Sequence, residues 1–156
     1  MQTAGKHHRI KCPFTATDAI IAYNDGSKPG LVLIERKNFP YGLALPGGFA
    51  EYGLTFEENV IKEVMEETGL EFIIDNPEHP LCVHSSPQRD PRAHICSLTY
   101  VGKGTGVLRG RDDAKSAACY PIPAVISLLG RNVFAFPDHE LALEEYLIQE
   151  GYLKNR

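Results

Sequence analysis

The sequence lacks tryptophan and has only two methionines and no long apolar run. Its apolar stretches, such as Ala19 to Tyr23, are far shorter than the ~20 residues of a membrane-spanning helix. The N-terminal residues MQTAGKHHRIKC contain no apolar core of a secretory signal. We therefore expect a cytoplasmic protein that makes no contact with membranes.

Two further absences limit the chemistry. The four cysteines are scattered and form no C-x-x-C pair, which argues against a zinc site or a disulfide framework. Positive charge is not in surplus, since the net charge is -4, and this gives no general attraction to nucleic acid. The 156 residues are expected to form a single domain, residues 1–156, in which residues 1–12 are a flexible leader.

Apolar segments separated by turn residues predict a mixed α/β fold. Strands are expected at 17–23 and 31–36, joined by the turn-rich residues 24–30. Shorter strands are expected at 41–45, 95–101 and 118–122. In a first helix, Thr55 and Glu58 have the spacing of a capping box, and Gly69 marks the end. Further helices are expected at about 139–150, between Asp138 as N-cap and Gly151, and at 124–129.

The first helix and the loop before it carry six glutamates between positions 51 and 67, opposed by one lysine, Lys62. Glu63, Glu66 and Glu67 lie within an arc of about 100° on one side of the helix. Such a group is either a solvated acidic face or a site for a hard cation such as Mg²⁺ or Mn²⁺. Glu51 can approach the same ion, and glycines at 47 and 48 allow a backbone carbonyl to do so. The chemistry indicated is metal-assisted attack on a phosphate or diphosphate.

The stretch from Gly48 to Leu70 closely resembles the Nudix box, G-x5-E-x7-R-E-U-x-E-E-x-G-U, where U is aliphatic. Seven of its nine defined positions match, namely Gly48, Glu63, Val64, Glu66, Glu67, Gly69 and Leu70. The resemblance extends over roughly residues 14–150 and includes LPGGF at 45–49. It implies an α/β/α sandwich with a mixed central sheet. It also implies Mg²⁺- or Mn²⁺-dependent hydrolysis of a nucleoside diphosphate linked to another moiety.

The family pattern assigns roles by position. It implies that Glu63 and Glu67 are the principal metal ligands, that Glu66 lies in or beside that shell, and that Gly47 offers its carbonyl. Two positions depart, because Leu54 replaces the first glutamate of the box and Lys62 replaces its arginine. In the family these two positions support the metal-binding glutamates. Lysine keeps the charge but lacks the planar fork of arginine. Loss of such support typically lowers metal affinity or activity about 10–100-fold.

The segment SPQRDPRAH, residues 86–94, resembles part of a group of ADP-ribose pyrophosphatases, as do GRDDAK at 110–115 and FPDHE at 136–140. ADP-ribose is therefore the expected substrate, split to AMP and ribose 5-phosphate. Arginines suit phosphate geometry, and the expected substrate contacts are Arg36, Arg89, Arg92 and His94. Asp90 can fold back on the loop or orient an arginine. Asp112 or Asp113, in the Gly-rich loop 102–113, can act as a base or a metal ligand, or the two can simply form a turn. The alternative for 86–94 is a proline-rich loop with an internal Arg–Asp pair.

The sequence is compatible with three functions. The first is the ADP-ribose hydrolase, and the second is a Nudix hydrolase for another nucleoside diphosphate sugar, a dinucleotide or an oxidised nucleoside triphosphate. The third is a weakly catalytic domain that binds ADP-ribose-like ligands as a sensor, which Leu54 favours and the intact glutamate trio opposes. Relatives with the first activity are often homodimers, so a homodimer is expected.

Overall fold

Residues 11–109 and 114–155 are described by a computed structural model of the chain. Residues 1–10 of the predicted leader and both Asp112 and Asp113 lie outside these ranges. Within them, every helix is too short or too polar to cross a bilayer.

A mixed sheet runs through the middle of the molecule, and its central strands are β1 (Phe14–Asn24) and β7 (Ile95–Thr105). These two strands pair in parallel, from Phe14 opposite Ile95 to Ala22 opposite Lys103. Strand β2 (Pro29–Arg36) returns antiparallel to β1 after the predicted turn. The order along the sheet is β3-β2-β1-β7-β5. The short strands are β3 (Leu43–Ala44), β4 (Gly47–Phe49), β5 (Glu71–Ile74) and β6 (Cys82–His84), and β8 (Ala114–Pro121) pairs with β2.

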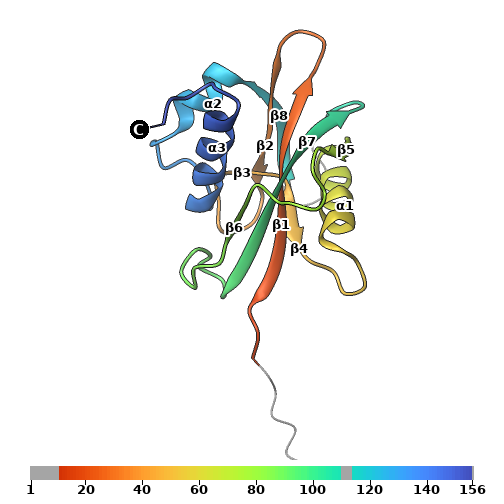
Figure 1. Cartoon of the computed structure of the whole chain (residues 1–156), viewed down its shortest axis with the longest axis vertical. Helices are drawn as coiled ribbons and strands as arrows, with labels where there is room; N and C mark the ends of the chain where they lie inside the picture. Colours follow the sequence, from red (N-terminus) through yellow and green to blue (C-terminus); the bar gives the residue numbers. More distant parts are fainter. Residues whose placement is uncertain (1–10, 110–113, 156) are drawn as a thin grey trace, which may run out of the picture.

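Helices cover both faces of this sheet (Figure 1). Helix α1 (Phe56–Thr68) lies on one face, and α2 (Ile122–Leu128) and α3 (Pro137–Gln149) lie on the other. Strand β1 serves both layers because successive side chains of a strand point to opposite faces. Ile20 packs in the core beside α3, whereas Ala19 and Ile21 pack in the core beside α1. The predicted α/β/α sandwich is confirmed.

Helix α1 is fixed at both ends by the predicted caps. The N–H of Glu58 donates to Thr55 Oγ1, and the N–H of Thr55 donates to Glu58 Oε2 at 2.9 Å. Gly69 ends the helix with φ of 74°, a left-handed conformation that glycine adopts without strain. Val60 and Val64 are fully buried against the sheet, which fixes the rotation of the helix and so the directions of Glu63, Glu66 and Glu67.

The prediction that Asp138 caps the last helix is wrong. Phe136 is the N-cap of α3, and Asp138 lies inside the first turn. The Asp138 carboxylate instead binds the guanidinium of Arg89, 49 residues away in the chain. An aspartate before an apolar run suggests a cap, but a buried cation was the stronger partner here. Strands β5 and β6 were also not predicted, since each is only three or four residues long.

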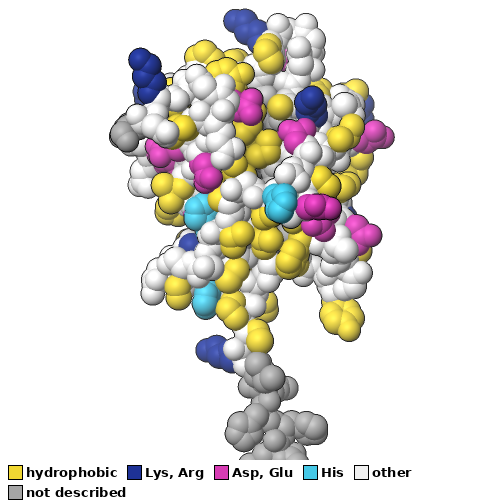
Figure 2. Space-filling model, viewed as in Figure 1, with side chains coloured by type: hydrophobic (Ala, Val, Ile, Leu, Met, Phe, Trp, Pro, Cys, Tyr) yellow, Lys and Arg dark blue, Asp and Glu magenta, His cyan; other side chains and the backbone are white. Residues whose placement is uncertain are grey.

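Figure 2 shows the face of the molecule that is viewed in Figure 1. Lysine and arginine side chains on this face stand apart from one another and do not merge into a basic patch. A continuous basic surface is the usual footprint of a protein that binds nucleic acid. Among the described residues, none is seen on this face.

Candidate active site

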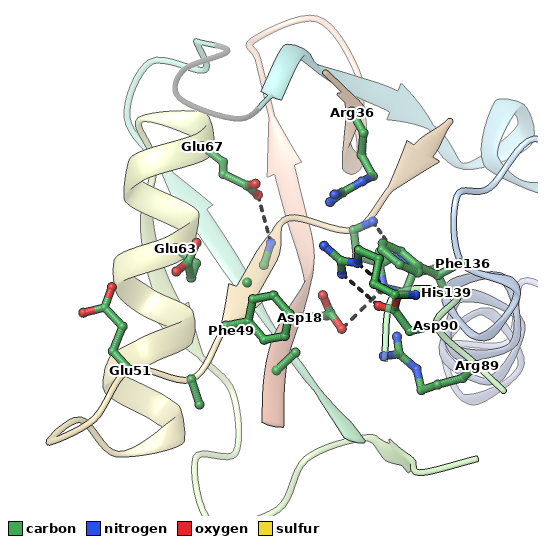
Figure 3. Close-up of a pocket in the computed structure, with 16 residues that line it drawn as sticks. Asp18, Arg36, Phe49, Glu51, Glu63, Glu67, Arg89, Asp90, Phe136 and His139 are labelled. Carbon is green, nitrogen blue, oxygen red and sulfur yellow. Dashed lines mark hydrogen bonds and ion pairs between the residues drawn. The ribbon is translucent and has the colours of Figure 1, made fainter. Parts of the chain in front are cut away.

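A cavity of about 340 Å³ lies between the α1 side of the sheet and the segment that leads into α3. Figure 3 shows that Glu51, Glu63 and Glu67 stand on one side of it, while Arg36 and Arg89 stand on the other. We call the first side the acidic wall and the second, with Arg92, the basic wall. Among the described residues, the lining is Ala16, Asp18, Arg36, Leu45, Gly47, Gly48, Phe49, Ala50, Glu51, Glu63, Glu67, Arg89, Asp90, Arg92, Phe136 and His139.

Glu67 is the most enclosed carboxylate of the acidic wall, with 5% of its surface exposed. Its Oε2 accepts a hydrogen bond of 2.9 Å from the N–H of Gly47. Burial raises the pKa of Glu67 to about 8 against this hydrogen bond, and the charges of Glu63 and Asp18 add to the rise. A cation beside these carboxylates would remove the repulsion. The donor set is therefore suited to a hard divalent ion.

Two glycines let the carboxylates approach the backbone. A Cβ atom on Gly48 would lie 2.6 Å from Glu63 Oε2, and one on Gly47 would lie 2.5 Å from Asp18 Oδ1. Both distances are shorter than any van der Waals contact, so any larger residue would displace a carboxylate. The Gly-Gly pair thus brings one stretch of main chain against the carboxylates of two different elements.

Glu66 takes a different direction from its two neighbours in the box. It does not line the cavity, and its Oε1 lies 2.7 Å from Lys62 Nζ. Across the described ranges, no three His, Cys, Asp or Glu side chains are already gathered as a metal cage. Mg²⁺ usually takes one or two carboxylates and completes its shell with water and phosphate oxygens.

The basic wall is assembled around one aromatic ring. The guanidinium carbons of Arg36, Arg89 and Arg92 lie 5.1, 5.5 and 5.5 Å from the ring centre of Phe136. Cations within about 6 Å of a ring face are attracted to it. Phe136 therefore holds three positive charges close together at one side of the cavity.

Each arginine of this wall has its own anchor. Arg92 binds Asp90 through Nε and Nη2 at 3.0 and 2.8 Å, which is also the internal Arg–Asp pair of the alternative reading of residues 86–94. Although burial acts against it, this pairing lowers the pKa of Asp90. Arg89 binds Asp138 through Nε and Nη2, and its side chain is only 5% exposed. Arg36 donates from Nε to the carbonyl of Pro40 at 2.8 Å.

His94 was expected to contact the substrate, but the histidine that lines the cavity is His139. His94 is exposed, its Nε2 lies 3.0 Å from the carbonyl oxygen of Ser85, and it does not line the cavity. His139 lines the cavity and is 2% exposed. Its Nδ1 accepts a hydrogen bond from the N–H of Leu45, so the proton of the neutral ring is on Nε2. That nitrogen lies 3.4 Å from Asp18 Oδ2.

Sequence reasoning missed Asp18, Phe136 and His139 as site residues. A signal for Asp18 was present, since it is the one charged residue within the apolar strand TDAIIAY. The FPDHE segment was noted as a landmark, but nothing in the letters shows that its Phe136 and His139 reach the cavity. Their placement depends on how α3 packs on the sheet.

The sequence model of the NUDIX domain family matches residues 13–135. With the box on α1 and the sandwich around it, the chain belongs to the Nudix family. It is similar to the ADP-ribose pyrophosphatase of Methanocaldococcus jannaschii, at 40% identity over 138 residues. That alignment covers 86% of this chain and 73% of the relative. Phe136 and His139 lie just past the end of the family match, so the family pattern alone does not complete the cavity.

Solved structures show the same fold. A MutT/nudix family protein from Enterococcus faecalis superposes with a TM-score of 0.61 at 31% identity. The match covers 71% of this chain but only 44% of that protein, so the relative is much longer than the matched region. The NUDIX domain of Shewanella oneidensis NrtR, solved with ADP ribose, gives a TM-score of 0.70 at 19% identity. That match covers 92% of this chain and 91% of that domain.

Proposed function

We propose that this chain hydrolyses ADP-ribose to AMP and ribose 5-phosphate with bound Mg²⁺ or Mn²⁺. The observation that supports this most directly is the division of one cavity into an acidic and a basic wall. A diphosphate needs cations on both sides, and here one side would be supplied by a metal and the other by arginines. The 40% identical ADP-ribose pyrophosphatase favours ADP-ribose among the possible diphosphates.

Glu63 and Glu67 hold the metal in this proposal, and Asp18 adds negative charge beside them. Gly47 fixes Glu67 through its N–H, and the Gly47 carbonyl stays a proposed further ligand. Glu66 acts outside the cavity, through Lys62. The bound ion would neutralise phosphate charge and lower the pKa of a coordinated water. The protein's own part is to hold its carboxylates close together, and the bound ion would favour their ionised forms.

Arg36 and Arg92 bind the phosphate oxygens in this proposal. Both line the cavity, and their cations face the same ring, Phe136. Arg89 is engaged with Asp138 and supports the wall from behind. Because His94 lies outside the lining, its contact with substrate stays a prediction, which loss of affinity in His94→Ala would support.

The test is release of AMP from ADP-ribose by the purified chain with Mg²⁺ or Mn²⁺. A panel of nucleoside diphosphate sugars, dinucleotides and oxidised nucleoside triphosphates examines the second enzymatic reading. Turnover of ADP-ribose with the highest kcat/KM supports the proposal, whereas preference for another compound replaces the substrate. Binding of ADP-ribose without turnover of any compound would establish the sensor, the reading that Leu54 favours.

We also propose the broader expectations for this chain: a homodimer in the cytoplasm that binds small nucleotides and no nucleic acid. The net charge of -4 supports the last point. Sedimentation velocity tests the dimer, and a single species of 17.3 kDa would contradict it.

A further inference from the structure

Lys62 joins the loop before α1 to the helix itself. Its Nζ lies 2.7 Å from Glu51 Oε1 and 2.7 Å from Glu66 Oε1. Glu51 lines the cavity, whereas Glu66 lies outside it. One cation therefore ties a carboxylate of the acidic wall to the outer side of the helix.

The main chain of Glu51 is held independently of this ion pair. Its N–H donates to Asn59 Oδ1 at 3.0 Å, and its carbonyl accepts from the N–H of Leu54 at 3.3 Å. Asn59 is completely buried and donates in turn to Thr17 Oγ1 on β1 at 2.9 Å. Glu51 thus presents its carboxylate to Lys62 from a fixed backbone, which lowers the entropy lost in forming the pair.

Leu54 occupies the box position at which the pattern has a glutamate, and its side chain has no group that can bind a cation. Lys62 occupies the position of the box arginine. An ammonium is a compact charge with three donors, so Lys62 can bridge two carboxylates without the fixed fork geometry of a guanidinium. With position 54 apolar, the carboxylate that the loop before α1 presents to Lys62 is that of Glu51.

We infer that Glu51, three residues before Leu54, supplies the carboxylate that position 54 lacks and is a positioning residue for the acidic wall. It acts through Lys62, which precedes Glu63 in the helix. The pair holds the end of β4 and the residues that follow it against α1, near the place where Gly48 meets the Glu63 carboxylate. This inference rests on the proposed function, because it assumes that Glu63 and Glu67 bind the metal.

The experiment measures Mn²⁺ dissociation constants of the full chain by electron paramagnetic resonance, without substrate. Glu51→Gln and Lys62→Met are each expected to weaken Mn²⁺ binding about 10-fold or more. The double variant should be no weaker than the worse single one, because both remove the same pair. Leu54→Glu should leave the wild-type constant nearly unchanged but restore binding in the Glu51→Gln background.

The exposed pair Glu35–Lys115, 3.0 Å apart, provides matched controls. Glu35→Gln and Lys115→Met should bind Mn²⁺ as the wild type does. The side chains of Lys62 and Glu51 are 36% and 49% exposed, so their loss should barely move the thermal midpoint. A large fall in that midpoint with Glu51→Gln would make Glu51 a fold residue and overturn the inference.

Three binding results would also overturn it. They are wild-type affinity in Glu51→Gln, multiplied losses in the double variant, and no recovery with Leu54→Glu. Tighter binding in Lys62→Met would show that Glu51 is itself a ligand that Lys62 restrains. If the wild type neither binds Mn²⁺ nor hydrolyses any nucleotide, the proposed function fails and the inference falls with it. If the wild type binds Mn²⁺ and turns over substrate, and Glu51→Gln behaves like the wild type, only the inference is refuted.

Discussion

His139 Nδ1 accepts a hydrogen bond of 3.0 Å from the backbone N–H of Leu45, and so connects α3 to the segment below the acidic wall. The next two residues are held by other elements. The carbonyl of Pro46 accepts from Ala19 on β1 at 2.8 Å, and the N–H of Gly47 donates to Glu67 on α1. Three consecutive residues are thus fixed by both helical layers and the sheet between them.

Two substitutions of His139 distinguish the contribution of its Nδ1 hydrogen bond from that of the rest of the ring. His139→Ala removes the acceptor of a buried N–H and leaves a cavity, and should lower the free energy of unfolding by about 2–4 kcal/mol. In His139→Asn the amide oxygen can take the place of Nδ1 and keep the Leu45 bond, so the loss should be smaller. Urea unfolding measures both. Equal losses would show that the hydrogen bond to Leu45 contributes little.

Glu67→Gln should remove activity without harming the fold. The amide oxygen of glutamine can still accept from Gly47, and the neutral side chain avoids the burial cost that raises the pKa of Glu67 to about 8. We expect kcat/KM to fall on the order of 100-fold or more, since a ligand should matter at least as much as its supports. AMP release and the thermal midpoint are measured together, with exposed Glu71→Gln as control. Wild-type turnover in Glu67→Gln would refute the metal assignment.

Metal binding should appear as a gain in stability. An ion that binds only the folded chain, at 100 times its dissociation constant, adds about 2.7 kcal/mol to the free energy of unfolding. Mn²⁺ should therefore raise the thermal midpoint of the wild type, and a chelator should reverse the rise. Glu67→Gln should show little of this response. A midpoint that ignores Mn²⁺ in the wild type would contradict the site.

Arg36 and Arg89 should respond differently to the same substitution. Arg89→Met leaves the buried carboxylate of Asp138 without its cation, and should lower the free energy of unfolding by about 3–5 kcal/mol. Arg36→Met should leave the fold nearly unchanged but raise KM for ADP-ribose about 10-fold, the worth of one charge-assisted hydrogen bond. Steady-state kinetics and urea unfolding distinguish the two. An unchanged KM in Arg36→Met would remove it from the substrate site.

The local signals in the sequence were sufficient for α1 and for the hairpin that joins β1 to β2. Thr55, Glu58 and Gly69 act within a few residues of each other, so their spacing alone predicts both helix ends. The same is true of the rotation of the helix, because Val60 and Val64 must face the sheet. The assignment of Glu63 and Glu67 to one cavity follows from that rotation.

Contacts between distant residues were beyond the reach of this reasoning. Asp138 has the local signal of a helix cap, and the sequence does not show that its partner is Arg89, 49 residues earlier. Glu66 shares the helical spacing of Glu63 and Glu67, but Lys62 holds it outside the cavity. His94 was expected in the site because it follows the arginine-rich segment, but chain proximity does not bring it to the lining. In each case the competing partner became visible only in three dimensions.

The parallel pairing of β1 with β7 affects how the chain folds as well as its final structure. Residue 14 meets residue 95, so the middle of the sheet closes only after a long loop has been ordered. Pairings of this range slow folding relative to local ones. A ribosome delivers the Gly47 segment early, yet His139, which holds Leu45, emerges almost a hundred residues later. The Gly47 segment is therefore synthesised long before the residue that fixes its neighbour Leu45.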